Sequence, residues 1–222
     1  MSTQQIPTDT YRTKEWHEEA RCGIKNIVKI LDLPHSVKEA AIQIINEHSK
    51  HIAHTNCFVG TVCASATIIA TRIHRDDVAE KILSKDAAYA ASESIGESTD
   101  RVTKEDVETH IRYIQSELSL TVPVETPTEF LSRLTNRLDM SQQSEKAAKR
   151  LIEEIEDQGH HSGQSPSGVA GAAVYIAAKE TGTRKKQNQA DIAEVVDISE
   201  VTLRKTRDYI RNEVDVKSTI NK

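Results

Sequence analysis

The sequence of 222 residues predicts an all-helical protein of two similar domains, the second of which ends in a helix-turn-helix. Three observations predict this fold class. The apolar residues are mostly Ala, Ile and Val, with only 4% aromatics, and small side chains suit closely packed helices. One pattern of apolar residues occurs twice. A short and a longer capped segment, separated by a tight turn, follow each other near the C-terminus.

The duplication appears when Leu31-Asp32-Leu33 is placed over Leu138-Asp139-Met140, an offset of 107. The later parts of the two copies match at an offset of 96, which places Val102-Thr103-Lys104 on Ile198-Ser199-Glu200 and Tyr113-Ile114 on Tyr209-Ile210. The first copy therefore carries eleven extra residues between Ile73 and Gly96, which we place around Arg75–Ala87.

Helical periodicity in the first copy predicts helices at Lys14–Leu31, Ser36–Ala53 and Val59–Thr71. Leu33-Pro34 ends the first of these, because a residue that precedes proline avoids the helical region. Val59–Thr71 contains so few polar residues that we expect it to be buried on nearly all sides.

The second copy repeats these elements at Glu129–Leu138 and Gln143–Gln158, followed by a central helix that ends at Lys179. Ser165-Pro166 supplies an N-cap serine and a first-turn proline for that helix. The predicted organisation is a polar tail (1–13), a first repeat (14–120), a Pro-containing linker (121–127), a second repeat (128–216) and a C-terminal tail (217–222).

The helix-turn-helix is expected between Asn188 and Arg211. Asn188 caps a short helix, Asp197-Ile198 forms the turn, and Ser199 caps a longer helix. This is the most basic part of the chain, with cations at Arg184, Lys185, Lys186, Arg204, Lys205, Arg207 and Arg211. Such a run favours contact with phosphates, although many charged runs are simply solvated surface.

Composition and motif content limit the other classes of protein to which the chain could belong. The net charge of −5 and the pI of about 6.0 count mildly against a simple nucleic-acid binder, so the positive face must be local. The N-terminus has no apolar signal core, and we expect a soluble cytoplasmic protein. No phosphate-cradling glycine loop, nucleophile elbow or paired carboxylate motif is present, so we predict neither an enzyme nor a cofactor.

Cysteine and histidine are the candidate metal ligands of the sequence. Cys22, Cys57 and Cys63 lack CxxC spacing, and buried reduced thiols are the expected interpretation. His48, His51 and His54, followed by Cys57, recur every three residues, but the stretch crosses a helix end. We therefore expect surface or partly buried histidines there, and likewise at His160-His161, and no metal site.

Four strings of the sequence resemble the core of archaeal transcription factor B and eukaryotic transcription factor IIB. They are Leu33-Pro34-His35-Ser36-Val37-Lys38-Glu39-Ala40, Ser165-Pro166-Ser167-Gly168-Val169-Ala170, Ala173-Val174-Tyr175-Ile176-Ala177-Ala178, and the run from Ala193 to Arg204. The last two are specific when they occur together and in order. The resemblance covers Lys14 to Val214 and is stronger in the second copy. It implies a protein of an archaeal cell or of an archaeal virus host.

The resemblance implies two cyclin-like domains of five helices each, bound to promoter DNA together with TATA-binding protein. It also implies that the second-repeat helix-turn-helix reads an upstream element in the major groove, with Val201 and Arg204 as the base-reading residues. An arginine can grip guanine through two hydrogen bonds, and a valine can pack on a thymine methyl. The remaining expected DNA contacts, to phosphates or flanks, are Lys205, Arg207, Arg211, Lys186, Gln189 and Ser165.

The family also carries an N-terminal zinc ribbon that engages RNA polymerase. This chain has no such cysteine spacing, so we do not expect polymerase binding through a ribbon. The insertion around Arg75–Ala87 lies near the surface by which the family touches TATA-binding protein.

Two functions of different classes follow. The first is a sequence-specific DNA-binding factor or regulator of transcription initiation. The alternative is a protein-binding cyclin-type module that holds a partner in a groove between helices. Salt dependence separates the two, because DNA binding weakens steeply as salt rises.

Overall fold

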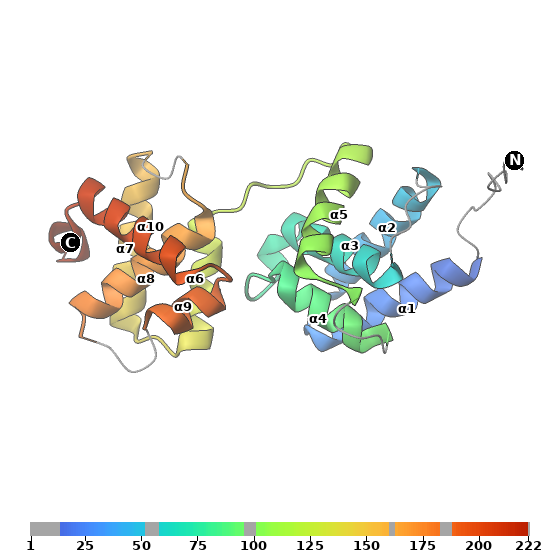
Figure 1. Cartoon of the computed structure of the whole chain (residues 1–222), viewed down its shortest axis with the longest axis horizontal. Helices are drawn as coiled ribbons and strands as arrows, with labels where there is room; N and C mark the ends of the chain where they lie inside the picture. Colours follow the sequence, from blue (N-terminus) through green and yellow to red (C-terminus); the bar gives the residue numbers. More distant parts are fainter. Residues whose placement is uncertain (1–13, 52–57, 96–100, 160–162, 183–187, 222) are drawn as a thin grey trace, which may run out of the picture. The chain divides into compact units, whose positions relative to one another are not determined.

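The computed structural model describes residues 14–51, 58–95, 101–159, 163–182 and 188–221. The regular secondary structure in these ranges is helical, as Figure 1 shows, which confirms the all-α fold class. The chain divides into two compact units. One consists of Met1–Val78 and Ile82–Pro123, and the other of Ala79–Lys81 and Val124–Lys222.

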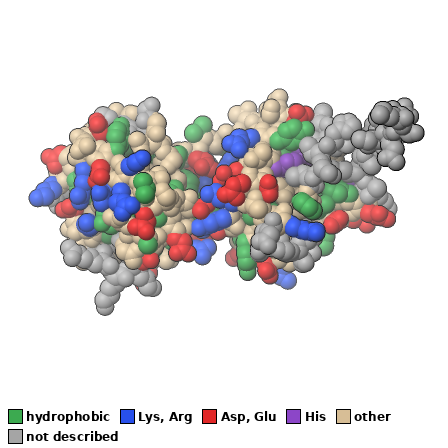
Figure 2. All heavy atoms as spheres, in the orientation of Figure 1, with side chains coloured by type: hydrophobic (Ala, Val, Ile, Leu, Met, Phe, Trp, Pro, Cys, Tyr) green, Lys and Arg blue, Asp and Glu red, His purple; other side chains and the backbone are tan. Residues whose placement is uncertain are grey.

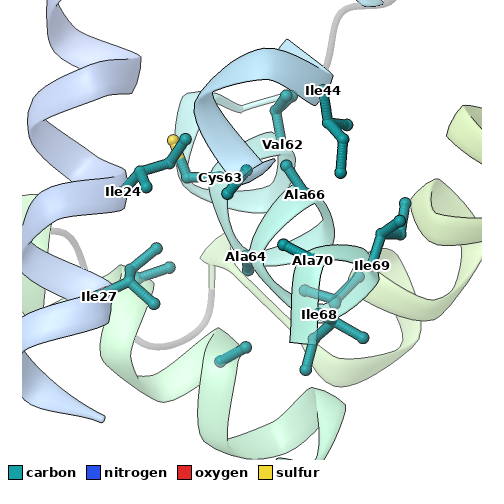
Figure 3. Close-up of a cluster of buried hydrophobic side chains, with 14 of the residues drawn as sticks. Ile24, Ile27, Ile44, Val62, Cys63, Ala64, Ala66, Ile68, Ile69 and Ala70 are labelled. Atoms are coloured by element: carbon teal, nitrogen blue, oxygen red, sulfur yellow. The ribbon is translucent and has the colours of Figure 1, made fainter. Parts of the chain in front are cut away.

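The first unit is built around one central helix. Its α-helices in the described residues are α1 (Lys14–Ile30), α2 (His35–His51), α3 (Val59–Ile73), α4 (Ser84–Ile95) and α5 (Lys104–Glu117), with a 3-10 turn η1 at Arg75–Asp77. Helix α3 packs against α1, α2, α4 and α5, and residues 60–71 are all buried. Figure 3 shows Ile24 and Ile27 of α1 and Ile44 of α2 around the small and branched side chains of α3. Small residues on α3 allow four neighbours to approach at once.

The second unit repeats this plan. Its α-helices in the described residues are α6 (Pro127–Leu138), α7 (Gln142–Asp157), α8 (Pro166–Glu180), α9 (Gln189–Val195), α10 (Glu200–Glu213) and α11 (Val216–Asn221). Helix α8 packs against α6, α7, α9 and α10, and residues 168–178 are all buried. The two units are therefore two five-helix repeats of one plan, and α11 is an addition to the second.

The helix boundaries agree with the two sequence offsets. Helices α7 and α8 begin 107 residues after α2 and α3, and α10 begins and ends 96 residues after α5. The first helix of each repeat also ends in the same way. Asp32 and Asp139 both have a left-handed backbone, with φ of 49° and 50°. The next residue donates its N–H back into the helix in each case, over 2.9 Å from Leu33 and 3.2 Å from Met140.

The eleven extra residues of the first copy are not confined to Arg75–Ala87, where we expected them. The connection from α3 to α4 has two more residues than that from α8 to α9, α4 is five residues longer than α9, and the connection from α4 to α5 has four more than that from α9 to α10. The first repeat thus has a longer helix and a longer turn where the second has its short helix and tight turn.

Two predicted boundaries differ from the structure. Pro127, placed in the linker, is the buried first residue of α6, a position that suits proline because the first helical N–H needs no partner. The expected C-terminal tail contains α11, which packs on α7. Arg150 of α7 donates to the Ile220 carbonyl over 2.8 Å, and Thr219 is buried. The tail was missed because α11 is too short to show a helical periodicity.

The cysteines and histidines of the first unit follow the expectations only in part. Cys63 is buried, as predicted, and its thiol donates to the Ala20 carbonyl. Cys22 is exposed, so the prediction of a buried thiol was wrong for this residue. His48 is fully buried, not at the surface, and its Nε2 lies 3.3 Å from Nε2 of His110. Cys57, His54, His160, His161 and the side chain of His51 lie outside the described residues.

Two negative findings concern the described residues alone. No three of their His, Cys, Asp and Glu side chains form a group that could hold a metal ion. None of their helices is long and apolar enough to cross a membrane. In the core of the first unit, Ile24 is fully buried, and Trp16 and Leu31 pack against it while partly buried.

Candidate nucleic-acid interface

The pair α9 and α10 has the short helix, tight turn and long helix that the sequence predicts. Asn188 Oδ1 accepts from the backbone N–H of Asp191 over 2.9 Å, and Ser199 Oγ accepts from that of Thr202 over 3.1 Å. Between the helices, Asp197 has a φ of 56° and Ile198 donates back to the Ala193 carbonyl over 2.9 Å. The left-handed residue ends α9 and redirects the chain into α10 within four residues.

Two glycines of α8 bring α9 and α10 close to the centre of the unit. A Cβ on Gly171 would lie 3.1 Å from Leu203 of α10 and 3.3 Å from both Ile192 and Val196 of the α9 segment. A Cβ on Gly168 would lie 3.2 Å from Thr206 of α10. Any larger residue at these positions would push the two helices outward, so the glycines set their distance from α8.

A buried arginine holds the end of α9. Arg133 of α6 is only 3% exposed, and its Nε donates to the carbonyl of Val195, the last residue of α9, over 2.9 Å. A cation is favoured at this end of a helix, where backbone carbonyls lack helical partners. Arg133 therefore fixes the first helix of the pair just before the turn. This role of Arg133 was not predictable, because a single arginine among apolar residues carries no motif.

The exposed face of α10 carries the predicted base-reading residues. Leu203, Thr206 and Ile210 are buried against the unit. On the opposite side Val201 is 52% exposed, and Arg204 and Lys205 are exposed too. Figure 2 shows Lys and Arg side chains on the surface of the second unit, with carboxylates among them. One apolar side chain and two cations thus project from the first half of a capped helix.

The other two predicted cations of α10 are paired with acids. Arg207, whose side chain is 19% exposed, lies 2.6 Å through Nη2 from Oδ1 of its neighbour Asp208. Arg211 Nη2 lies 3.9 Å from Glu180 Oε1 at the end of α8. Both acids would have to give way to a phosphate, so Arg204 and Lys205 are the more accessible cations of this helix.

The three remaining predicted contacts have different surroundings. Ser165 caps α8, and its Oγ accepts from the Gly168 N–H over 3.1 Å. Gln189, the first residue of α9, donates from Nε2 to the Tyr175 hydroxyl over 3.1 Å. Lys186 lies outside the described residues. Ser165 thus stabilises the start of α8, and Gln189 connects the start of α9 to α8.

A cationic cluster around a tyrosine was not foreseen. Tyr175 of α8 is 8% exposed, and its ring centroid lies 4.7 Å from Lys179 Nζ and 5.8 Å from Arg207 Cζ. Burial by itself raises the pKa of the Tyr175 phenol, but hydrogen bonds from Lys179 and Gln189 and the charges of Lys179 and Arg207 outweigh it and hold that pKa below its ordinary value. We call Tyr175, Lys179, Gln189 and Arg207 the phenol cluster. The spacing of Tyr175 and Lys179, one helical turn apart, was its only sequence signal.

The first unit contains a groove of about 460 Å³ beside α2, the end of α3 and the end of α5. Ile44 and Leu118 contribute apolar surface, Ile73 is 39% exposed at its edge, and Glu47 and Glu117 also line it. This is the feature that a protein-binding module would use.

Comparison with known proteins gives one family. The family model "Transcription factor TFIIB repeat" matches residues 120–213. Transcription initiation factor IIB 2 of Haloferax volcanii is 34% identical over 152 residues, which cover 63% of this chain and 45% of the relative. Transcription initiation factor IIB 2 of Thermoplasma acidophilum is 26% identical over 208 residues, which cover 87% of this chain and 62% of the relative.

A third relative, transcription initiation factor IIB of Pyrodictium occultum, is 28% identical over 192 residues, which cover 84% of this chain and 56% of the relative. The chain thus spans about half the length of the curated relatives it matches. Among solved structures, a viral cyclin from herpesvirus saimiri matches with a TM-score of 0.40 and 14% identity, over 96% of this chain and 90% of that one.

Proposed function

The chain belongs to the transcription factor IIB family, and from this premise we propose that it binds promoter DNA in transcription initiation. Its recognition helix, α10, enters the major groove upstream of the TATA box, and TATA-binding protein on the same DNA is its partner. Relatives across 84–87% of this chain are named transcription initiation factors, which supports this role and gives no support to an enzyme.

One observation carries the proposal: Val201 and Arg204 project together from the exposed face of α10. The other face of α10 is buried on α8, so the helix is held while its N-terminal half stays open to a ligand. Residues in the first turns of a recognition helix reach base edges. Arg204 would grip a guanine, Val201 would pack on a thymine methyl, and Lys205 would contact a phosphate.

The test is a gel-shift on an archaeal promoter duplex, with and without TATA-binding protein, comparing the wild-type chain with Arg204→Ala. The wild type should supershift the complex formed by TATA-binding protein. Arg204→Ala should bind more weakly by about 1–3 kcal/mol on the preferred element. Lys146→Ala, an exposed cation on α7, is the matched control. Equal binding by wild type and Arg204→Ala on every sequence would remove Arg204 from the reading role.

The groove of the first unit favours a second candidate, a protein-binding module. Its occupant would be an amphipathic segment with an apolar anchor and flanking cations, because apolar walls stand beside Glu47 and Glu117. A synthetic Leu- and Lys-containing helical peptide should then bind the wild type, and Glu47→Lys with Glu117→Lys should weaken it. A peptide with Glu in place of Lys is the control. Equal binding of both peptides would exclude the groove as a site for basic segments.

A further inference from the structure

The phenol cluster brings together hydrogen-bond donors and positive charges that packing within the unit does not require. Resting on the proposed function, we propose that Tyr175, Lys179 and Arg207 bind one phosphate of the DNA backbone beside the recognition helix. The three side chains come from α8 and α10, so the site spans the central helix and the helix that would read the bases. A phosphate held there would fix the register of α10 in the groove.

The hydroxyl of Tyr175 supplies the first argument. It accepts a hydrogen bond from Gln189 Nε2 over 3.1 Å and a second from Lys179, so its lone pairs are engaged. Its own proton remains, and within the described part of the chain the structure records no acceptor for that proton. A phenol beside two cations is a stronger hydrogen-bond donor than an ordinary one, and its depressed pKa reflects the same surroundings. An anionic oxygen is the acceptor that such a donor suits.

The two cations supply the second argument. Lys179 Nζ and Arg207 Cζ lie within 6 Å of the same ring, and Lys179 is exposed. No carboxylate is recorded within ion-pair distance of Lys179 in the described residues, so it can approach an incoming anion without breaking an ion pair. A phosphodiester offers several acceptor oxygens to a hydroxyl, an ammonium and a guanidinium at once. Its position next to α10 makes the DNA backbone the source of that phosphate.

Asp208 controls how readily this site accepts an anion. Its carboxylate holds Arg207 through both Nε and Nη2, over 2.8 Å and 2.6 Å, and is itself 61% exposed. An arriving phosphate competes with Asp208 for the guanidinium and is repelled by its charge. Removing that charge should therefore tighten DNA binding.

Fluorescence anisotropy on two labelled duplexes tests the proposal: a promoter duplex and a random-sequence duplex, both titrated over a range of salt. Lys179→Met should weaken binding to both by roughly eightfold at 0.1 M salt, and should make the slope of log K against log salt shallower by about 0.9. Tyr175→Phe keeps the ring and removes only an uncharged hydroxyl, so it should weaken binding roughly twofold to tenfold with an unchanged slope. Asp208→Asn should tighten binding. Lys146→Met, on α7, is the control and should leave both quantities as in the wild type.

The outcomes separate the phosphate site from the proposed function. The site is overturned if Lys179→Met and Tyr175→Phe bind as the wild type does while Arg204→Ala loses sequence preference, because base reading would then proceed without them. If Lys179→Met weakens binding to every duplex while Arg204→Ala changes nothing, the site stands and base reading by α10 is wrong. A wild-type chain that binds neither duplex, either alone or with TATA-binding protein, overturns both. Circular dichroism melts of each variant identify any loss that comes from unfolding.

Discussion

Helices α5 and α10 occupy the same place in the two repeats and differ mainly on their outer faces. Both have fourteen residues, and both are capped by a hydroxyl, from Thr103 in α5 and Ser199 in α10. At the offset of 96, the inner residues Val107 and Leu203 correspond, as do Ile114 and Ile210, and all four are buried. At the outer positions, Val201 and Arg204 correspond to Glu105 and Glu108.

This difference teaches that the repeat preserves the helix and leaves the function to a few exposed side chains. Helix α5 has four carboxylates against Lys104 and Arg112, whereas α10 has four cations against three carboxylates. DNA would be repelled by the first surface and attracted by the second. The turn differs too, because α5 follows α4 after eight residues and α10 follows α9 after four. The first repeat therefore has neither the charge nor the tight turn of a DNA reader.

The largest effect is expected when α10 receives the outer residues of α5. Val201→Glu combined with Arg204→Glu removes the base contacts and places two carboxylates against phosphates, so affinity for promoter DNA should fall by about a hundredfold or more. Anisotropy measures the loss, and thermal melts should show the fold unchanged because both positions are exposed. The reciprocal change, Glu105→Val with Glu108→Arg, should create no sequence-specific binding. A specific binder produced by the reciprocal change would show that the turn is unimportant.

The next effect concerns the inner face, where Gly171 of α8 corresponds to Ala64 of α3. Gly171→Ala should destabilise the protein by about 1–2 kcal/mol, because the new Cβ meets Leu203, Ile192 and Val196, which are all buried and have no room to move. Urea unfolding measures the free energy. If the variant were as stable as the wild type, the close approach of α9 and α10 to α8 would not depend on glycine.

The two caps should have equal effects on stability and unequal effects on binding. Ser199→Ala and Thr103→Ala should each cost about 1 kcal/mol of unfolding free energy, because each removes the acceptor of a backbone N–H over 3.1 Å. Only Ser199→Ala should also weaken DNA binding. Equal weakening by both substitutions would mean that the loss follows from general instability.

The smallest effect is expected in the turn. Asp197 has a left-handed backbone that glycine adopts more readily, so Asp197→Gly should stabilise the second unit by a few tenths of a kcal/mol up to about 1 kcal/mol. Asp197→Val should destabilise it, because a β-branched residue is strained at this φ. A melt of both variants gives the sign. A destabilised Asp197→Gly would show that the carboxylate itself holds the turn.

The repeated helices were predictable because their signals are local. Pro34, Ser165 and Ser199 mark helix ends by backbone chemistry alone, and apolar spacing in α2, α7 and α10 identifies the buried face. The outward direction of Val201 and Arg204 follows from the same spacing. Short α11 and the wide distribution of the first-repeat insertion carried no such periodic signal.

The rest of the site depends on distant packing, which one sequence does not display. Arg133 donates to Val195, which lies 62 residues further along the sequence, and the Tyr175 ring of α8 contacts Arg207 of α10. Arg207 and Asp208 are adjacent in sequence, but the sequence pattern does not show that their side chains point toward each other and pair. Cys22 and His48 were misjudged for a similar reason, because their burial is decided by neighbours from other helices.

The enclosure of α3 and α8 by four helices each has a consequence for motion. Backbone amides in their middle turns can reach solvent only after the surrounding helices separate, so they should exchange hydrogen for deuterium last in each repeat. Amides of the short outer helices α9 and α11 should exchange first, through local opening. Exchange in α10 should be intermediate, because α10 packs on the slowly exchanging α8 and directly follows the rapidly exchanging α9.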